Sequence, residues 1–405
     1  MPTKTWRQLP ILLFIATVLI ACTATIAPAW VATFNPKAQE EPDRLAWFDD
    51  MEVDSYGNVV VAASTIRASM ELHIHDFALV KFDATGNRLW SRVLDLSTSR
   101  YKSDDSPLEL VLDTADNIYV LVEQFRIVSE QESASGNYLI SFDANGNERW
   151  RQELGEGTNF RTLTLANNQL YVSGPETRVF NLNGSQLLSF EHPHHVARSV
   201  AVNRNGDIAL GGGSAVTLFN AQGQQLWHHR LSDRDWAFGE TRFTLQGDLV
   251  ATNALEENGG ASLARFSATG ELLWFKVFSA AYESYGLPGR PRVFEDYRGD
   301  LLLLASNEDG HRIVKLDAAG RVTWNRRGKK MISDAAMRDG DLFIVGGGTN
   351  AKYDTDGNRV AESSLREYIQ ITTGSAAIDG DRLYAGYSAN VNGTFVLHLS
   401  QYLDQ

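Results

Sequence analysis

Short apolar runs recur along the whole chain, and each run follows a pair of turn-forming residues, most often Gly-Asp or Gly-Asn. Gly57-Asn58 precedes three valines, and Gly299-Asp300 precedes four leucines. Apolar runs of about four to eight residues between turn residues are typical of β-strands. The phrase occurs eight times, at residues 57–61, 116–120, 168–172, 206–210, 247–250, 299–302, 340–343 and 380–384.

A second phrase follows most of these runs: an aromatic residue or leucine, then Asp, Asn or Ser, two further residues, glycine, three residues and tryptophan. Phe82-Asp83 with Gly86 and Trp90 is the first copy. The polar side chain caps a hairpin turn, and glycine adopts the positive φ that other residues resist. There are seven copies, and the tryptophan is replaced by Leu188 in the third and by Ala361 in the seventh.

Together the two phrases predict an all-β protein, an eight-bladed β-propeller with four-stranded antiparallel blades. The glycines of the second phrase lie 37 to 60 residues apart, the span of a propeller blade with variable loops. The eighth unit lacks a fourth strand, and Arg44-Leu45-Ala46-Trp47 resembles one. We therefore expect residues 43–405 to form one ring, closed by pairing of the N- and C-terminal strands. A seven-bladed ring is the alternative, if the third or seventh unit merges with a neighbour.

The N-terminus has the pattern of an export signal, because Lys4 and Arg7 precede an apolar run at residues 9–20. Twelve helical residues would span about 18 Å, less than the hydrocarbon core of a bilayer. The run ends in Leu19-Ile20-Ala21-Cys22, which resembles the lipobox of bacterial lipoproteins. The resemblance implies a signal peptide at 1–21, lipidation of Cys22 and, with Thr23 after it, sorting to the outer membrane.

Residues 22–42 then read as the lipidated cysteine and a flexible tether, with Pro28, Pro36 and Pro42 and no sustained period. Two alternatives remain for this region. The apolar stretch could be an uncleaved anchor, or Ala27-Pro28-Ala29 could be an ordinary cleavage site. In all three interpretations the propeller is exported.

The repeated Asp, Gly and Trp positions also resemble the quinoprotein-like (PQQ-like repeat) propeller family, whose members include bacterial lipoproteins similar to BamB. The resemblance covers nearly all of the chain after Asp43 and implies fold more than function. It implies that the tryptophans pack between blades. Quinone-dependent enzymes of this family would need adjacent cysteines, whereas Cys22 is the only cysteine, so we expect no such cofactor.

The net charge and the cysteine count exclude several classes of partner and of metal site. The chain has 37 basic and 50 acidic residues, a net charge of −13, and loss of Lys4 and Arg7 would leave 35 against 50, or −15. Such a field repels nucleic acid. One cysteine excludes intrachain disulfides and zinc sites with several thiolates. One chain can close the ring, so we expect a monomer that contacts the membrane through its lipid.

The predicted channel-lining strands are mainly aliphatic or small, with only Glu52, Glu109 and Glu295 as scattered carboxylates. Catalysis in a propeller channel needs several converging carboxylates or histidines. The pattern therefore favours a non-enzymatic scaffold or binding module for an envelope protein or polymer, with a role in outer-membrane assembly implied by the family. The alternative is a hydrolase or lyase acting on a sugar, sulfate ester or lactone in the channel.

Histidines offer one candidate metal set, His192, His194 and His195, although strand and loop histidines usually have structural roles and we expect no metal. Arginine and aromatic residues gather in the segments that join one predicted blade to the next, which should emerge on one face. Both residue types are enriched at binding hot spots. The candidate binding rim comprises Tyr101, Arg161, Arg198, Trp236, Arg242, Tyr282, Tyr285 and Arg292.

Overall fold

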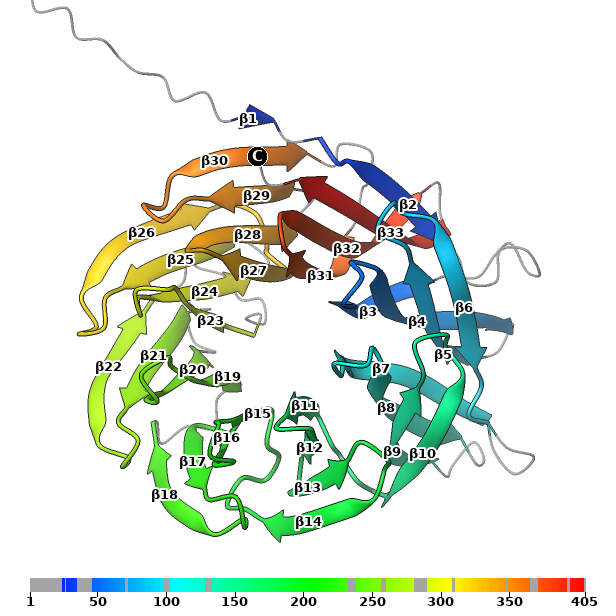
Figure 1. Cartoon of the computed structure of the whole chain (residues 1–405), viewed down its shortest axis with the longest axis horizontal. Helices are drawn as coiled ribbons and strands as arrows, with labels where there is room; N and C mark the ends of the chain where they lie inside the picture. Colours follow the sequence, from blue (N-terminus) through cyan, green and yellow to red (C-terminus); the bar gives the residue numbers. More distant parts are fainter. Residues whose placement is uncertain are drawn as a thin grey trace, which may run out of the picture.

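The structure is a computed structural model, and it confirms the eight-bladed propeller: eight sheets surround a central channel (Figure 1). It describes residues 24–25, 27–34, 46–69, 72–97, 102–127, 133–231, 238–255, 260–279, 290–307, 310–346, 349–364, 371–391 and 394–403. Throughout these residues the regular elements are strands, and no helix there is long and apolar enough to cross a membrane.

Each of the first four blades is a sheet of consecutive antiparallel strands. Blade 1 contains β3 (Ala46–Val53), β4 (Val59–Ser69), β5 (Leu72–Phe82) and β6 (Arg88–Leu94). Blade 2 contains β7 (Lys102–Leu112), β8 (Ile118–Ile127), β9 (Ser133–Phe142) and β10 (Glu148–Glu156). Blade 3 contains β11 (Thr162–Ala166), β12 (Gln169–Ser173), β13 (Glu176–Asn181) and β14 (Gln186–Glu191). Blade 4 contains β15 (Ser199–Val202), β16 (Ile208–Gly212), β17 (Ala215–Phe219) and β18 (Gln225–Arg230).

The other four blades follow the same order, with strands from the N-terminus added to the last two. Blade 5 contains β19 (Phe238–Phe243), β20 (Leu249–Leu255), β21 (Gly260–Phe266) and β22 (Leu272–Phe278). Blade 6 contains β23 (Arg292–Glu295), β24 (Leu301–Asn307), β25 (Gly310–Leu316) and β26 (Val322–Gly328). Blade 7 contains β27 (Asp334–Arg338), β28 (Asp341–Gly346), β29 (Thr349–Tyr353), β30 (Arg359–Ser364) and β1 (Ala24–Thr25). Blade 8 contains β31 (Ile371–Asp379), β32 (Arg382–Val391), β33 (Thr394–Leu403) and β2 (Trp30–Phe34).

The Asp-x-x-Gly tetrad forms the predicted hairpin turn between the third and fourth strands. In blade 1, Asp83 Oδ1 accepts hydrogen bonds from the backbone N–H of Thr85 (2.8 Å) and of Asn87 (2.9 Å). Gly86 has a φ of 87° and donates its N–H to the carbonyl of Asp83. The turn thus depends on the capping carboxylate and on a residue without a side chain.

The tryptophans pack between blades, as predicted. Trp90 of blade 1 lies on the turn of blade 2, where a Cβ on Gly146 would lie 2.9 Å from its ring, and Trp90 Nε1 donates to the carbonyl of Ala144 (3.2 Å). The same contact joins Trp150 to Gly184, Trp227 to Gly270, Trp274 to Gly320 and Trp324 to Gly357. Tryptophan and glycine therefore recur together because they touch across each blade boundary.

Tryptophan is absent from two copies of the phrase, for different reasons. In blade 3, Phe190 takes the place of the ring and lies against Gly223 of blade 4. In blade 7, no such glycine lies opposite Ala361 among the described residues, because the fourth strand of blade 8 is β2 from the N-terminal part of the chain and no hairpin joins it to β33.

The ends of the chain close the ring as expected, but through a different strand. The fourth strand of blade 8 is β2, which pairs antiparallel with β33, and not residues 44–47. Trp47 instead belongs to β3, the first strand of blade 1. Trp30 of β2 supplies the missing tryptophan: it lies on Gly86 and donates Nε1–H to the carbonyl of Ala84 (3.0 Å). The ring therefore includes residues that we assigned to the tether.

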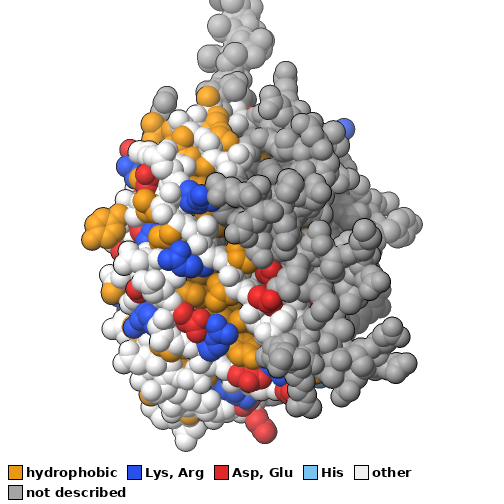
Figure 2. Space-filling model, turned by 90° about the vertical axis from the view of Figure 1, so that its right-hand side faces the viewer, with side chains coloured by type: hydrophobic (Ala, Val, Ile, Leu, Met, Phe, Trp, Pro, Cys, Tyr) orange, Lys and Arg blue, Asp and Glu red, His pale blue; other side chains and the backbone are white. Residues whose placement is uncertain are grey.

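The apolar core lies mainly between neighbouring blades. One cluster, for example, combines Val60 and Phe77 of blade 1 with Leu110, Val120 and Ile140 of blade 2. The outer edge of the ring is mixed: Figure 2 shows basic, acidic and apolar side chains interspersed on the visible part of one side. Charges on exposed edge strands discourage pairing with other chains.

Candidate functional site in the central channel

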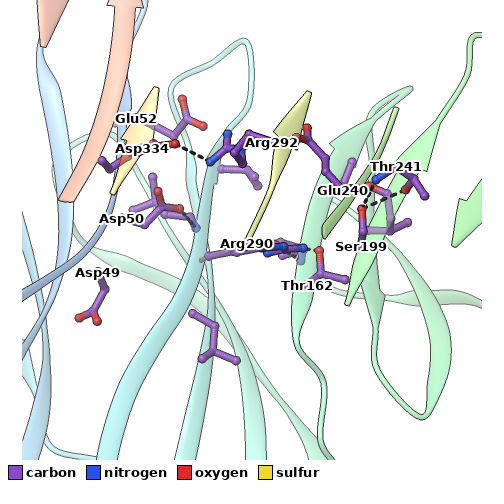
Figure 3. A pocket seen from close by; sticks show the side chains of 18 of the residues that line it. Asp49, Asp50, Glu52, Thr162, Ser199, Glu240, Thr241, Arg290, Arg292 and Asp334 are labelled. Carbon is purple, nitrogen blue, oxygen red and sulfur yellow. Dashed lines mark hydrogen bonds and ion pairs between the residues drawn. The ribbon is translucent and has the colours of Figure 1, made fainter. Parts of the chain in front are cut away.

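The first strand of every blade lines the channel, and one equivalent position in these strands is polar all the way around. The strand register defines this position. The residue that follows it in the first strand pairs with the third residue of the apolar run in the second strand, as Met51 pairs with Val61 and Val293 with Leu303. All eight residues line one cavity of about 400 Å³ (Figure 3). We call them the channel belt: Asp50, Glu109, Thr162, Ser199, Glu240, Arg292, Asp334 and Ser375.

The four carboxylates of the channel belt each bind the backbone of the following blade. Asp50 accepts the N–H of Leu110 (2.9 Å), and Glu109 accepts the N–H of Leu163 (2.5 Å). Glu240 accepts the N–H of Val293 (3.0 Å), and Asp334 accepts the N–H of Ala376 (3.0 Å). Such a hydrogen bond is charge-assisted, and therefore strong, whenever the carboxyl group is ionised. These side chains therefore join the inner edges of neighbouring blades.

Two arginines cross the acidic part of the channel. Arg292 Nη1 lies 2.5 Å from Asp334 Oδ1, and its Nε lies 3.5 Å from Glu240 Oε2. The Asp334 carboxylate, and then that of Glu240, hold the pKa of Arg292 further above its usual value. Arg290, just before β23, donates Nε–H to the carbonyl of Gly239 (2.8 Å) and lies 3.6 Å from Glu109.

Several channel carboxyl groups hold protons more tightly than free ones. Burial, and then the charge of Glu52, raises the pKa of Asp50 well above its usual value. Burial, and then the charge of Asp334, raises the pKa of Glu52 to about 7. Burial also raises the pKa of Glu109, although the nearby Arg290 opposes this. The channel therefore carries less negative charge at neutral pH than its carboxyl groups suggest.

The expectation of a mainly aliphatic channel was wrong. Besides Glu52 and Glu109, the structure brings together Asp50, Glu240 and Asp334, which the sequence analysis missed. The missed signal was a polar residue directly before an apolar pair, which is present in five of the eight first strands, as at Asp334 before Ala335-Ala336. Glu295 lies at the end of β23, where it accepts the N–H of Leu245 (2.6 Å).

The described members of the candidate rim occupy different places. Arg161 lies at the end of a blade connection and pairs with Glu123 (2.8 Å), while Arg198 lies at the end of the next connection and is exposed. Arg242 and Arg292 lie within inner strands and line the channel. The other candidates lie outside the described residues: Tyr101, Trp236, Tyr282 and Tyr285, as does Cys22.

The histidine set does not converge on one point. His194 Nδ1 donates to the carbonyl of Gly212 (3.0 Å), so its Nε2 accepts from the Thr217 hydroxyl (3.0 Å). Thr217 in turn accepts from His228 Nδ1 (2.7 Å). Burial lowers the pKa of His194 to about 4, which keeps the ring neutral. With both nitrogens occupied, His194 has no lone pair to offer a metal shared with His192 or exposed His195.

One group of potential metal ligands does gather within the described residues. Oxygen atoms of Asp76, Asp95 and Asp105 lie within 4.8 Å of one another. Asp105 already accepts the N–H of Leu96 (2.8 Å) and the hydroxyl of Ser103 (3.1 Å). These bonds give Asp105 a role in the local fold.

Comparison with known proteins agrees with the architecture. The family model described as outer membrane protein assembly factor BamB matches residues 75–265 and 259–397. No curated protein matches the sequence. BamB from Moraxella catarrhalis superposes with a TM-score of 0.58 at 13% identity, over 93% of this chain and 100% of its own. The Dos1 propeller superposes with a TM-score of 0.64 at 13% identity, over 93% of this chain and 95% of its own.

At such low identity the two solved structures show the shared fold alone. The family model extends over most of the ring and over the blades that carry the Asp-x-x-Gly and tryptophan positions. This chain therefore belongs to the PQQ-like repeat propeller family whose model is described as outer membrane protein assembly factor BamB.

Proposed function

We propose that this protein is a non-enzymatic envelope lipoprotein, a propeller scaffold that binds an envelope protein or polymer and acts in outer-membrane assembly. The observation that carries the proposal is the use of the channel belt. Asp50, Glu109, Glu240 and Asp334 each accept a backbone N–H of the next blade. The hydrolase or lyase alternative requires two carboxylates that are free to act on one substrate. The belt carboxylates are already committed to joining the ring.

The family supports the location and the role. Its model is described as an outer-membrane assembly factor. The apolar run at residues 9–20 and the Leu19-Ile20-Ala21-Cys22 sequence support export and lipidation at Cys22. The binding surface that we propose is the rim of blade connections. Among the described residues, the arginines of this rim are Arg161 and Arg198. Arginine is enriched at binding hot spots.

Two variants of the full chain test the proposal. Cys22→Ala should move the protein from the membrane fraction to the periplasmic fraction, and retention in the membrane would contradict lipid anchoring. Arg161→Ala/Arg198→Ala should lower the recovery of partners cross-linked in intact cells. Arg321→Ala is the matched control, because Arg321 is 83% exposed and follows a hairpin turn of blade 6. Equal partner recovery with Arg161→Ala/Arg198→Ala and with Arg321→Ala would contradict the proposal that the rim is the binding surface.

A further inference from the structure

One mouth of the channel is described completely, because the eight turns that join first and second strands all lie within the described residues: 54–58, 113–117, 166–169, 203–207, 244–248, 296–300, 338–341 and 379–382. Two residues beyond the channel belt, the first strands present a second set of equivalent positions. Glu52 pairs with Val60 in blade 1 and Arg242 pairs with Val250 in blade 5, at matching places in the second strands. We call these positions the mouth ring: Glu52, Val111, Thr164, Ala201, Arg242, Phe294, Ala336 and Ala377.

The mouth ring contains two charges of opposite sign on opposite sides of the channel. Blades 1 and 5 are four blades apart in a ring of eight, so β3 and β19 face each other across the opening (Figure 1). Glu52 and Arg242 line the same cavity, which has a volume of about 430 Å³. The other six residues of the ring are uncharged. A negative and a positive group therefore face one cavity from opposite walls.

Neither Glu52 nor Arg242 forms an ion pair within the described part of the chain. Figure 3 shows Glu52 beside the Asp334–Arg292 pair, and no hydrogen bond or ion pair joins its side chain to another described side chain. Arg242 is exposed and likewise forms no ion pair there. Arg242 acts electrostatically on Glu295, but Oε2 of Glu295 accepts the N–H of Leu245, and the two side chains form no ion pair. Unpaired opposite charges in a cavity favour a ligand that supplies both counter-charges.

We propose that this mouth of the channel binds a zwitterion, a small molecule or chain terminus that carries an ammonium group and a carboxylate. The ammonium lies at Glu52 and the carboxylate lies at Arg242. A guanidinium can hold a carboxylate through two parallel hydrogen bonds, which orients the ligand. A ligand with only one of the two charges satisfies one wall and leaves the other without a partner.

The affinity depends on the ionisation of Glu52. Its charged surroundings are Asp50 on the same strand, Asp334 on β27 and Arg292 on β23. Because Glu52 has a pKa of about 7, most of it is protonated at pH 5.5, and we expect zwitterion affinity about tenfold weaker there than at pH 7.5. A bound ammonium group stabilises the ionised carboxylate, so binding at pH 7 releases protons.

The test uses ω-amino acids of increasing length on the purified full-length chain. Glycine, 4-aminobutyrate and 6-aminohexanoate are compared with hexylamine and hexanoate by titration calorimetry. We expect one ω-amino acid to bind at least about tenfold more tightly than either singly charged probe, and its length reports the span between the two charges. Zwitterions that bind no better than hexylamine and hexanoate would overturn the proposal.

Variants separate the two walls. Arg242→Gln should weaken the zwitterion about tenfold and spare hexylamine, whereas Glu52→Gln should do the same and spare hexanoate. The exchanged pair Glu52→Arg/Arg242→Glu should recover zwitterion binding, because the ligand can turn around. Arg298→Gln, on an exposed turn at the same mouth, is the matched control. Thermal melting checks that each variant is folded, and unchanged zwitterion affinity in folded Arg242→Gln would refute the site.

Discussion

Replacement of Gly146 by alanine tests why glycine recurs in the hairpin turn of each blade. Gly146 has a φ of 75°, and a Cβ there would lie 2.9 Å from the ring of Trp90 in the preceding blade. Gly247, in a turn of blade 5, has a φ of 87° but no atom within 4 Å of the added Cβ. The two glycines therefore share the backbone requirement, and only Gly146 has the tryptophan contact.

The structure predicts unequal losses of unfolding free energy. A left-handed conformation costs a residue with a Cβ about 1–2 kcal/mol, and both variants should lose this amount. Gly146→Ala also pushes the Trp90 ring out of a packed boundary, and overpacking of this kind costs about 1–3 kcal/mol. We therefore expect a loss of about 2–5 kcal/mol for Gly146→Ala against about 1–2 kcal/mol for Gly247→Ala.

Urea unfolding followed by tryptophan fluorescence measures both losses. The Trp90→Leu background supplies the second control, because removal of the large ring should reduce the cost of Gly146→Ala to that of Gly247→Ala. Equal destabilisation of the two single variants would refute the contact as the reason for the glycine. The contact would also be refuted if Gly146→Ala lost the same unfolding free energy in the Trp90→Leu background as in the wild-type chain.

Three further predictions concern the channel belt, the channel carboxyl groups and the ring closure. Asp334→Ala leaves Arg292 without its main partner and should cost about 2–4 kcal/mol in urea unfolding, below the value for a fully buried pair because the Arg292 side chain is 38% exposed. Asp334→Asn keeps an acceptor for the neighbouring blade and should cost about half as much, and a larger loss for Asn than for Ala would contradict this role. Burial mainly raises the pKa of Glu52 and of Asp49 to about 7 in the folded state, from ordinary values of 4.5 and 3.8. Unfolding therefore releases protons from these two groups between those values, and their contribution to stability falls as pH rises from about 4 to 7. Glu52→Gln/Asp49→Asn should flatten this dependence in thermal melts, and an unchanged slope would count against the assignment. Trp30→Ala should cost about 3 kcal/mol because it opens the blade 8 to blade 1 boundary, whereas Trp30→Phe should retain most of the packing; a stability unchanged by alanine would show that the ring closes without this side chain.

The blades were predictable because their determinants are local. Asp83 and Gly86 specify a hairpin through contacts within five residues, and a turn of the same kind recurs in seven of the eight blades. Closure of the ring by β2 was not predictable from the sequence. No turn phrase adjoins Trp30-Val31-Ala32-Thr33-Phe34, whereas residues 44–47 resemble a fourth strand. Only pairing with β33, far away in sequence, identifies β2 as part of the ring.

The candidate site was harder to predict than the fold. Glu52 and Glu109 were singled out as channel carboxylates, but Asp50, Glu240 and Asp334 were not. A single acidic residue in a first strand gives no local sign of a site, because its neighbours in the channel come from other blades. Register across eight sheets was needed to align these positions.

Sequence by itself determined the repeated unit and the number of blades, because turn capping, positive φ and alternating apolar positions act over a few residues. Tertiary structure alone decided which end strand closes the ring, and it placed the belt carboxylates on the backbone of the next blade. It also set Glu52 and Arg242 across one cavity. Charges separated by nearly half of the chain interact only after the ring has closed, so no local pattern could reveal them.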